Sequence, residues 1–408
     1  MWSAAAVMSP RHHRLVVTFA FSILAASCAS GPAGSSTTAA SAGATVLAAL
    51  AIAPVSRITF EVELGGFATR GEIVHPQAGS VHGDGPFPLV LLVCGNGPHD
   101  MDVTLPGPDG TVRLFAQIAD TLAARGFAVA RYNKRFVTGP GKFDARFWRE
   151  QSTLTFTKDA GKVLDAVLAI PVCDPARVVL YGWSEGTAVS AQLATERADI
   201  KALVLQGAVG LPYRDMVRGW IADVGVPYAQ GPDGGAITAT DLAGALRGKG
   251  GMVAKLSASF FADPATAFSK TPAVSPLLDV NHDGELDAVT EVPGSIDVIV
   301  DYAFSKNGNC YIYAEGRTVP TVTEQASKLG MPVLILQGEN DASTPARGGQ
   351  ALAAALVAAG NAHTTLRLLP ALGHTLGPAA SLIDDAGRAP SEATLVPIAE
   401  WLGDALSR

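Results

Sequence analysis

The chain has 408 residues, of which 48% are apolar and only 16% charged. This composition supports a large core and excludes a globally disordered protein. Acidic residues outnumber basic ones, 37 against 30, and the net charge of −7 argues against a nucleic-acid binder. Four cysteines with no CxxC and no zinc-type spacing exclude a disulfide scaffold and a structural zinc protein.

The first segment of the chain carries a predicted export signal. Basic residues at 11–14 precede an apolar run over 15–26, which is too short to span a bilayer. We therefore expect a signal peptide over 1–27, followed by a flexible tether over 28–56 that is rich in small residues. The mature protein would be exported.

The end of the apolar run resembles a bacterial lipobox. It reads Leu24-Ala25-Ala26-Ser27-Cys28, with Ala25 at the place of the usual leucine. The resemblance implies a lipid anchor on Cys28 and a cell-envelope lipoprotein. The alternative is an ordinary signal peptide cut after Ala29, which would give a periplasmic or secreted protein.

Beyond residue 56, strand and helix patterns alternate. The stretches 57–64 and 68–74 have period two and predict an antiparallel pair. Five continuous apolar runs are typical of strands buried on both faces: 89–94, 127–132, 178–181, 202–206 and 333–337. Helical periods lie at 112–125, 156–169, 187–197, 349–359 and 392–406. The alternation predicts an α/β fold with a mostly parallel central sheet flanked by helices.

One interval, 211–329, breaks this alternation and is dense in Gly and Pro. We interpret it as a cap inserted between two parts of the core, 57–210 and 330–408. Its larger aromatic residues could line an acyl pocket or form the cap's own core: Trp220, Phe260, Phe261 and Phe268. Cys94, Cys173 and Cys310 could form one disulfide in an exported chain, and the sequence does not say which two would pair.

The strand at 178–181 runs into Gly182-Trp183-Ser184-Glu185-Gly186, and a helical stretch follows. This is G-x-S-x-G in a strand–turn–helix context, which predicts that Ser184 is a nucleophile. A serine needs a base, and the base needs an acid that orients it.

The base and the acid are each expected in a loop after a strand. His374 follows the apolar stretch 366–369, and Asp341 follows the strand at 333–337. All three residues thus lie past the carboxyl ends of strands, where open α/β sheets place their sites. Their order, Ser184, Asp341, His374, favours a catalytic triad. Glu339 is the alternative acid.

Catalysis by a serine also requires donors for the developing oxyanion. The strand at 89–94 runs into Cys94-Gly95-Asn96-Gly97-Pro98. We expect the amides of Asn96 and of Glu185 to be the two donors. The alternative for the first loop is a glycine-rich turn without a catalytic role.

These motifs resemble those of α/β-hydrolase fold serine hydrolases of the bacterial esterase type. Residues 94–100, C-G-N-G-P-H-D, match the family's H-G-S-G-P-x-D except at Cys94 and Asn96. Residues 132–135, Y-N-K-R, resemble Y-D-K-R with Asn133 in place of Asp. The resemblance covers both parts of the core, leaves out the cap, and implies an α/β-hydrolase fold.

The cap contains a calcium-like loop over 279–290. Oxygen ligands stand at the spacing of an EF-hand or dockerin loop, with Glu285 supplying a backbone carbonyl. The five expected ligands are Asp279, Asn281, Asp283, Glu285 and Asp287. Position twelve departs from the pattern, because it holds Thr290 and the acidic Glu291 comes one residue later. The alternative is an acidic surface turn that binds no metal.

Together these features predict an exported serine hydrolase that cleaves a small-molecule carboxylic ester through an acyl-enzyme. Catalysis would need no cofactor, calcium would be structural, and only the anchor at Cys28 would contact a membrane. A peptidase or thioesterase with the same triad remains an alternative. So does a non-catalytic surface protein that binds a partner through the calcium loop and the cap.

Overall fold

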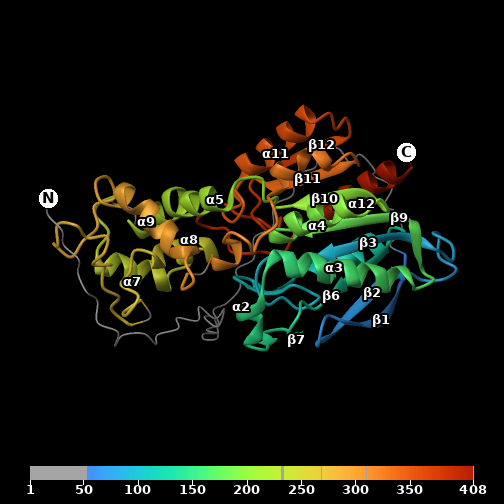
Figure 1. Ribbon diagram of the computed structural model, residues 1–408, viewed down its shortest axis with the longest axis horizontal. Helices are drawn as coiled ribbons and strands as arrows, with labels where there is room; N and C mark the ends of the chain where they lie inside the picture. The colour runs from blue at the N-terminus through green and yellow to red at the C-terminus, as the bar shows by residue number, and fades with distance from the viewer. Residues whose placement is uncertain (1–52, 231–233, 268, 309, 408) are drawn as a thin grey trace, which may run out of the picture.

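The computed structural model describes residues 53–230, 234–267, 269–308 and 310–407 (Figure 1). The expected signal peptide, Cys28, nearly all of the tether and Phe268 lie outside the described residues. The first strand begins at Val55, so the core starts two residues before the expected boundary.

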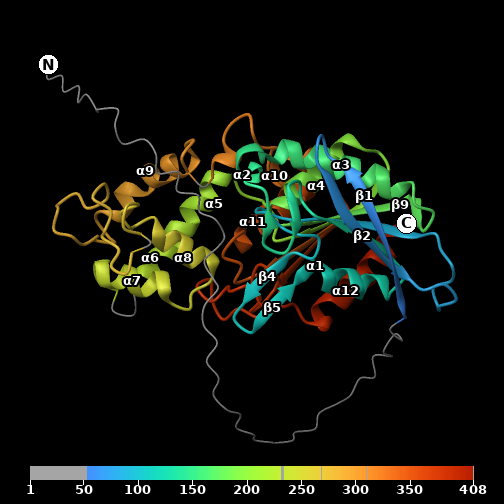
Figure 2. The same cartoon turned by 90° about the horizontal axis from the view of Figure 1, so that it is seen from below.

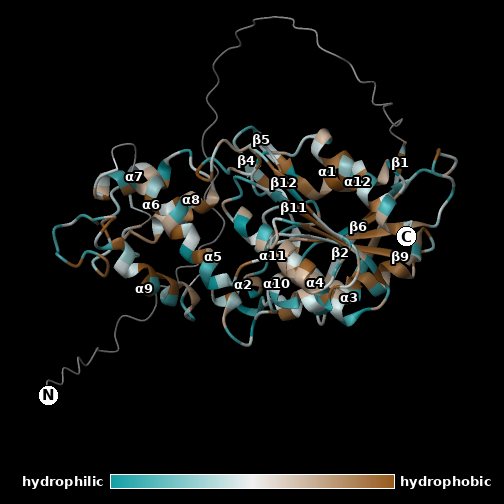
Figure 3. Cartoon of the chain, turned by 90° about the horizontal axis from the view of Figure 1, so that it is seen from above, coloured by the Kyte–Doolittle hydropathy of each residue, from teal (hydrophilic) through white to brown (hydrophobic). Residues whose placement is uncertain are grey.

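Eight strands form one sheet in the order β1-β2-β6-β3-β9-β10-β11-β12. Their bounds are β1 Val55–Glu63, β2 Ala68–Pro76, β3 Phe87–Val93, β6 Ala128–Tyr132, β9 Cys173–Trp183, β10 Ile200–Gln206, β11 Val333–Gly338 and β12 Thr364–Leu369. β2 pairs antiparallel with both β1 and β6, and the other neighbours pair in parallel. The continuous apolar strands of the parallel part are buried on both faces, which confirms the predicted fold class (Figure 3).

Helices cover both faces of the sheet (Figure 2). One face packs against α1 (Leu114–Ala123) and α12 (Glu392–Leu406). The other packs against α3 (Thr153–Leu168), α4 (Glu185–Glu196) and α11 (Ala346–Ala358). Each helix turns an apolar stripe to the sheet, so two separate apolar layers sandwich the strands.

The interval between β10 and β11 is mainly helical and forms a lobe beside the sheet (Figure 1). Its elements are α5 Tyr213–Gly219, the π-helix η1 Trp220–Gly225, α6 Val226–Ala229, α7 Ala239–Arg247, α8 Met252–Ser259, α9 Val292–Phe304, the 3-10 turns η2 Tyr311–Tyr313 and η3 Ala326–Lys328, and α10 Val322–Gln325. Phe261 is fully buried in the lobe's own apolar cluster, and Trp220 and Phe260 pack against that cluster. These three aromatics therefore build the cap.

Short elements occupy the loops at the carboxyl edge of the sheet. They are the hairpins β4 (Thr104–Gly107) with β5 (Gly110–Arg113) and β7 (Val137–Gly139) with β8 (Lys142–Phe143), and the helix α2 (Arg146–Glu150). β5 takes the first residues of the helix expected over 112–125, so α1 begins only at Leu114.

The three cysteines of the described chain are free and buried, so Cys94, Cys173 and Cys310 form no disulfide with one another. Burial raises the pKa of the Cys94 thiol to about 11, which keeps it protonated at neutral pH. Within the described ranges, no helix has the length and apolar character needed to cross a membrane.

Candidate active site

Ser184 stands on a sharp turn between β9 and α4. Its φ of 57° lies in the left-handed region, which is strained for a residue with a side chain. Its amide donates to Gln206 O at 2.9 Å, and its carbonyl accepts from Thr187 N at 2.9 Å. A Cβ at Gly186 would overlap Val93 O, so only glycine lets the helix start this close to β3. The turn therefore presents Ser184 at the carboxyl edge of the sheet.

Asp341 and His374 form a buried pair. Asp341 Oδ2 accepts from His374 Nδ1 at 2.9 Å and from Thr344 Oγ1 at 2.8 Å. Asp341 Oδ1 accepts the amides of Ser343 and Thr344 at 2.9 and 2.8 Å. Because Nδ1 donates to the carboxylate, Nε2 is the nitrogen left to accept a proton. Burial opposes the charged imidazolium, but Asp341 outweighs it and raises the pKa of His374.

Among the described residues, no hydrogen bond joins Ser184 to His374. The indole of Trp183, directly before Ser184, lies 5.1 Å from the His374 ring between centroids. Hydrogen bonds between a catalytic serine and its histidine are often long before substrate binds. The rival acid Glu339 is exposed and is not brought to His374, so the geometry favours Asp341.

The loop after β3 lies against the turn that carries Ser184. In the described structure, the main-chain amides of Asn96 and Glu185 donate to no protein acceptor, as the predicted oxyanion donors require. Asn96 O accepts from His99 Nε2 at 2.5 Å, which fixes the peptide after the expected donor. Burial, with the charge of Lys134, lowers the pKa of His99 to about 3, so this imidazole stays neutral.

Lys134 joins the oxyanion loop to the elbow, a role that sequence reasoning missed. Its Nζ donates to Gly95 O at 2.5 Å and lies 3.3 Å from Glu185 Oε1. It also stands 3.9 Å from the centroid of the Phe156 ring. Lys134 and Glu185 are both buried. The Y-N-K-R motif was the available signal, but its partners are set by tertiary packing.

Asp385 is a second buried carboxylate beside the histidine, and sequence reasoning also missed it. It accepts the amide of His374 at 3.1 Å through Oδ1. Burial and the charge of Asp341 raise the pKa of Asp385 to about 6. Its segment, between β12 and α12, has no motif that would have pointed to it.

The calcium-like loop forms a closed acidic turn. Asp279 Oδ2 accepts Gly284 N at 2.9 Å, and Asp287 Oδ1 accepts Thr290 N at 2.7 Å. Glu291 reaches back to accept the amides of Val280 at 2.8 Å and of Asp287 at 2.9 Å. Asp279, Asn281, Asp283, Glu285 and Asp287 thus share one loop. Across the described ranges no three acidic, His or Cys side chains are arranged to hold a metal, and calcium stays a prediction.

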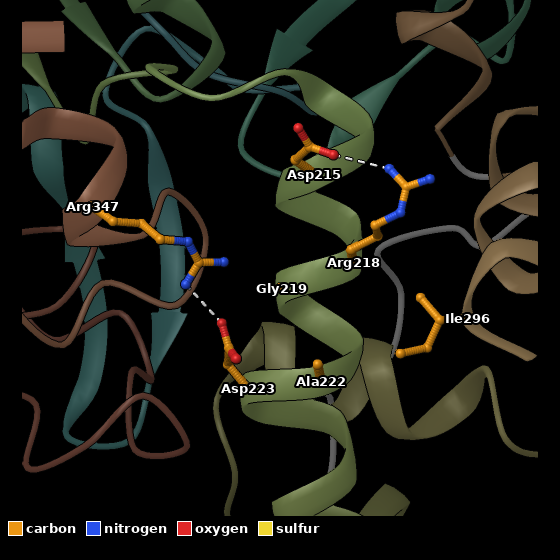
Figure 4. Close-up of a pocket in the computed structure, with 7 residues that line it drawn as sticks. All are labelled: Asp215, Arg218, Gly219, Ala222, Asp223, Ile296 and Arg347. Carbon is orange, nitrogen blue, oxygen red and sulfur yellow. Dashed lines mark hydrogen bonds and ion pairs between the residues drawn. The ribbon is translucent and has the colours of Figure 1, made fainter. Parts of the chain in front are cut away.

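A pocket of about 360 Å³ lies on the cap side of α11 (Figure 4). Its lining comprises Asp215, Arg218, Gly219, Ala222, Asp223, Ile296 and Arg347. Figure 4 shows Arg347 reaching Asp223, at 2.7 Å, and Arg218 reaching Asp215, at 2.9 Å. None of the predicted catalytic residues lines this pocket, and its charges neutralise one another.

Comparison with known proteins gives matches in both parts of the core. A family model described as "Serine aminopeptidase, S33" matches residues 100–224, and one described as "TAP-like protein" matches residues 297–376. Esterase EstD of Thermotoga maritima is 34% identical over 152 residues, which is 36% of this chain. The match covers 32% of that relative, so the chain spans about a third of its length.

Solved structures are similar at low identity. Acylaminoacyl peptidase of Pyrococcus horikoshii has 13% identity and a TM-score of 0.49, over 87% of this chain and 41% of that chain. Est1E from Butyrivibrio proteoclasticus has 13% identity and a TM-score of 0.45, over 86% of this chain and 99% of that chain. The sheet order, the strand–Ser184–helix turn and the sequence matches together show an α/β-hydrolase fold, similar to that of esterases.

Proposed function

We propose that this protein is a serine esterase that hydrolyses carboxylic esters through Ser184, His374 and Asp341. The observation that carries the proposal is the buried 2.9 Å bond from His374 Nδ1 to Asp341 beside a strained nucleophile elbow. The likeness to Esterase EstD supports the ester as the bond that is cleaved.

The geometry supports a two-step acyl transfer. Ser184 Oγ attacks the ester carbonyl while His374 Nε2 takes its proton, and the carbonyl oxygen becomes an anion held by the amides of Asn96 and Glu185. His374 then protonates the departing alcohol as the acyl-enzyme forms. Water attacks the acyl-enzyme, again losing a proton to His374, and releases the acid with Ser184 restored.

An aminopeptidase is the second candidate, because one matching family model is described as a serine aminopeptidase. Recognition of a free amino terminus calls for a carboxylate that faces the substrate. The carboxylate next to Ser184 in the chain belongs to Glu185, and Lys134 pairs with it. Glu185 is therefore already paired, and the likeness to Esterase EstD favours the ester reaction.

The test is hydrolysis of p-nitrophenyl esters from C2 to C12 by the wild type and Ser184→Ala. We expect activity in the wild type, and the chain-length optimum then sizes the acyl site. Removal of the nucleophile should lower kcat by on the order of 10⁶-fold. Ser190→Ala is a matched control, because it removes a serine hydroxyl of helix α4 that makes no hydrogen bond to the described residues.

Aminoacyl p-nitroanilides and acyl thioesters assayed in parallel test the peptidase and thioesterase alternatives. A folded wild type that cleaves none of these substrates and does not react with a fluorophosphonate probe would contradict the serine hydrolase proposal. It would favour a non-catalytic surface protein instead.

Export belongs to the proposal as well. It is supported by the N-terminal sequence alone, with a lipid anchor at Cys28 as the expected membrane contact. Labelling of cells with a radioactive fatty acid, with Cys28→Ala beside the wild type, distinguishes a lipoprotein from a free secreted enzyme.

A further inference from the structure

Asp385 lies at the junction of the two loops that carry the acid and the base. Its carboxylate accepts the amide of His374 at 3.1 and 3.2 Å, and its Oδ2 also accepts the amide of Ala342 at 3.0 Å. Ala342 directly follows Asp341. One side chain, 8% exposed, therefore connects the main chain of both triad loops.

The main chain of His374 is fixed from its other side too. Its carbonyl accepts from Trp183 Nε1 at 3.1 Å and from Gln206 Nε2 at 3.2 Å. Among the described side chains that bind the main chain of His374, only Asp385 brings a negative charge. The imidazole thus depends on Asp385 both for its position and for part of its electrostatic surroundings.

The fold makes room for this carboxylate. A Cβ at Gly373 would overlap the side chain of Asp385, so glycine permits the close approach. The cap packs behind the same segment, where Gly251 N donates to Ile383 O at 2.8 Å and Ile383 joins a cluster with Ala342. The segment that carries Asp385 is thereby held between the cap and the acid loop.

Two carboxylates face His374, those of Asp341 and Asp385. Burial opposes its positive charge, but Asp341 and then Asp385 raise the pKa of His374 above its ordinary value. His99 also faces His374 and is neutral at ordinary pH. Arg388 faces Asp385 but is ion-paired with Asp384 at 3.0 Å.

We propose that Asp385 is a positioning residue for the catalytic base: it keeps the acid and histidine loops in register and stabilises the imidazolium that forms when His374 takes the Ser184 proton. The proposal rests on the proposed function, which assigns His374 as the base. A misplaced or less basic imidazole would slow proton transfer without removing the nucleophile.

Asp385→Asn tests this, because an amide oxygen in the place of Oδ2 can still accept the amides of His374 and Ala342, while the charge and the Oδ1 contact are lost. NMR titration of the His374 imidazole should give a lower pKa in the variant than in the wild type. The base works when it is neutral, so the acid limb of kcat/KM should move to lower pH. We expect kcat to fall by up to about 100-fold with KM little changed.

Asp384→Asn is the matched control, since this partly exposed neighbour pairs with Arg388 and should keep the wild-type pH profile. Asp385→Ala removes both amide contacts and should lose more kcat than Asp385→Asn. If the alanine variant fails to fold, the asparagine variant alone tests whether Asp385 positions His374.

The NMR titration needs no substrate, so the two proposals can fail separately. An inactive wild type in which Asp385→Asn still lowers the pKa of His374 would overturn the esterase and support the role of Asp385 at the imidazole. An active Asp385→Asn variant with unchanged kcat, unchanged acid limb and an unchanged His374 pKa would overturn the positioning role.

Discussion

At the scale of single residues, Lys134 and Glu185 form a buried ion pair beneath the nucleophile. Nζ of Lys134 lies between Glu185 Oε1, at 3.3 Å, and Gly95 O, at 2.5 Å. Lys134 is the cation that pairs with the buried Glu185, and the Tyr313 hydroxyl is a second neighbour of the same carboxylate. Breaking such a pair leaves the remaining charge without compensation, which is far costlier than never having buried it.

Lys134→Met should therefore destabilise the protein by about 3–5 kcal/mol, measured by urea unfolding. It should also lower kcat, because Gly95 precedes the expected oxyanion donor Asn96. The double variant Lys134→Met, Glu185→Gln should recover most of the lost stability, since no unpaired charge is left. An unfolding free energy for the single variant equal to that of the double would contradict this account.

The same scale shows what sequence can and cannot predict. Ser184, Asp341 and His374 could be proposed because a motif or a strand end marks each one. Asp385 could not, because its partners are main-chain amides of His374 and Ala342, which leave no trace in side-chain spacing. His99 was visible in the oxyanion motif, but its contact with Asn96 depends on how the loop folds back.

At the scale of elements, the strands of the parallel sheet were predictable because burial on both faces gives continuous apolar runs. The cap was predicted only as an interval in which the alternation of strands and helices breaks off. Its helix α7 begins at a capping box formed by Thr238 and Asp241, a local signal that could have been found. The helix α9 begins at Val292 after the acidic loop, with Pro293 in its first turn, and its partners in the cap core lie far away in sequence.

The acidic loop before α9 carries the calcium prediction. Calcium should raise the Tm of the mature protein, because the loop residues from Asp279 to Glu291 lead directly into a helix of the cap core. At a calcium concentration 100 times its Kd the stabilisation would be about 2.7 kcal/mol. Differential scanning calorimetry in calcium and in EGTA measures it, with magnesium as the control cation.

Asp283→Asn is the informative variant for this loop, because Asp283 is exposed and accepts only local contacts from Asn281 and Glu285. It removes a negative charge and keeps one oxygen ligand, so it should reduce the calcium-dependent rise in Tm while leaving the Tm in EGTA nearly unchanged. Equal Tm values for the wild type in calcium and in EGTA would contradict the calcium prediction and show that the loop is an acidic turn that binds no metal.

At the scale of the whole molecule, the cap and the core meet at the acid loop. Trp220 Nε1 donates to Ser343 O at 2.8 Å, and Asp223 pairs with Arg347 at 2.7 Å. Both contacts start from the π-helix η1, an irregular element that is often found at functional sites. Ser343 in turn donates its amide to Asp341. The seating of the cap is thus connected to the orientation of the acid.

Trp220→Phe tests this connection, because it keeps an aromatic ring and removes only the indole donor. We expect kcat to fall by about fivefold, the equivalent of about 1 kcal/mol, as the acid loop loses one anchor. Trp401→Phe is the matched control, since Trp401 lies on α12 and the change removes an indole bond of 3.1 Å to Thr365 of β12. Both variants should lose similar unfolding free energy, and only Trp220→Phe should lose kcat. Equal kcat values in the two variants would mean that the cap contact does not orient the acid loop. Asp385 would then be the contact that holds Asp341 and His374 in register.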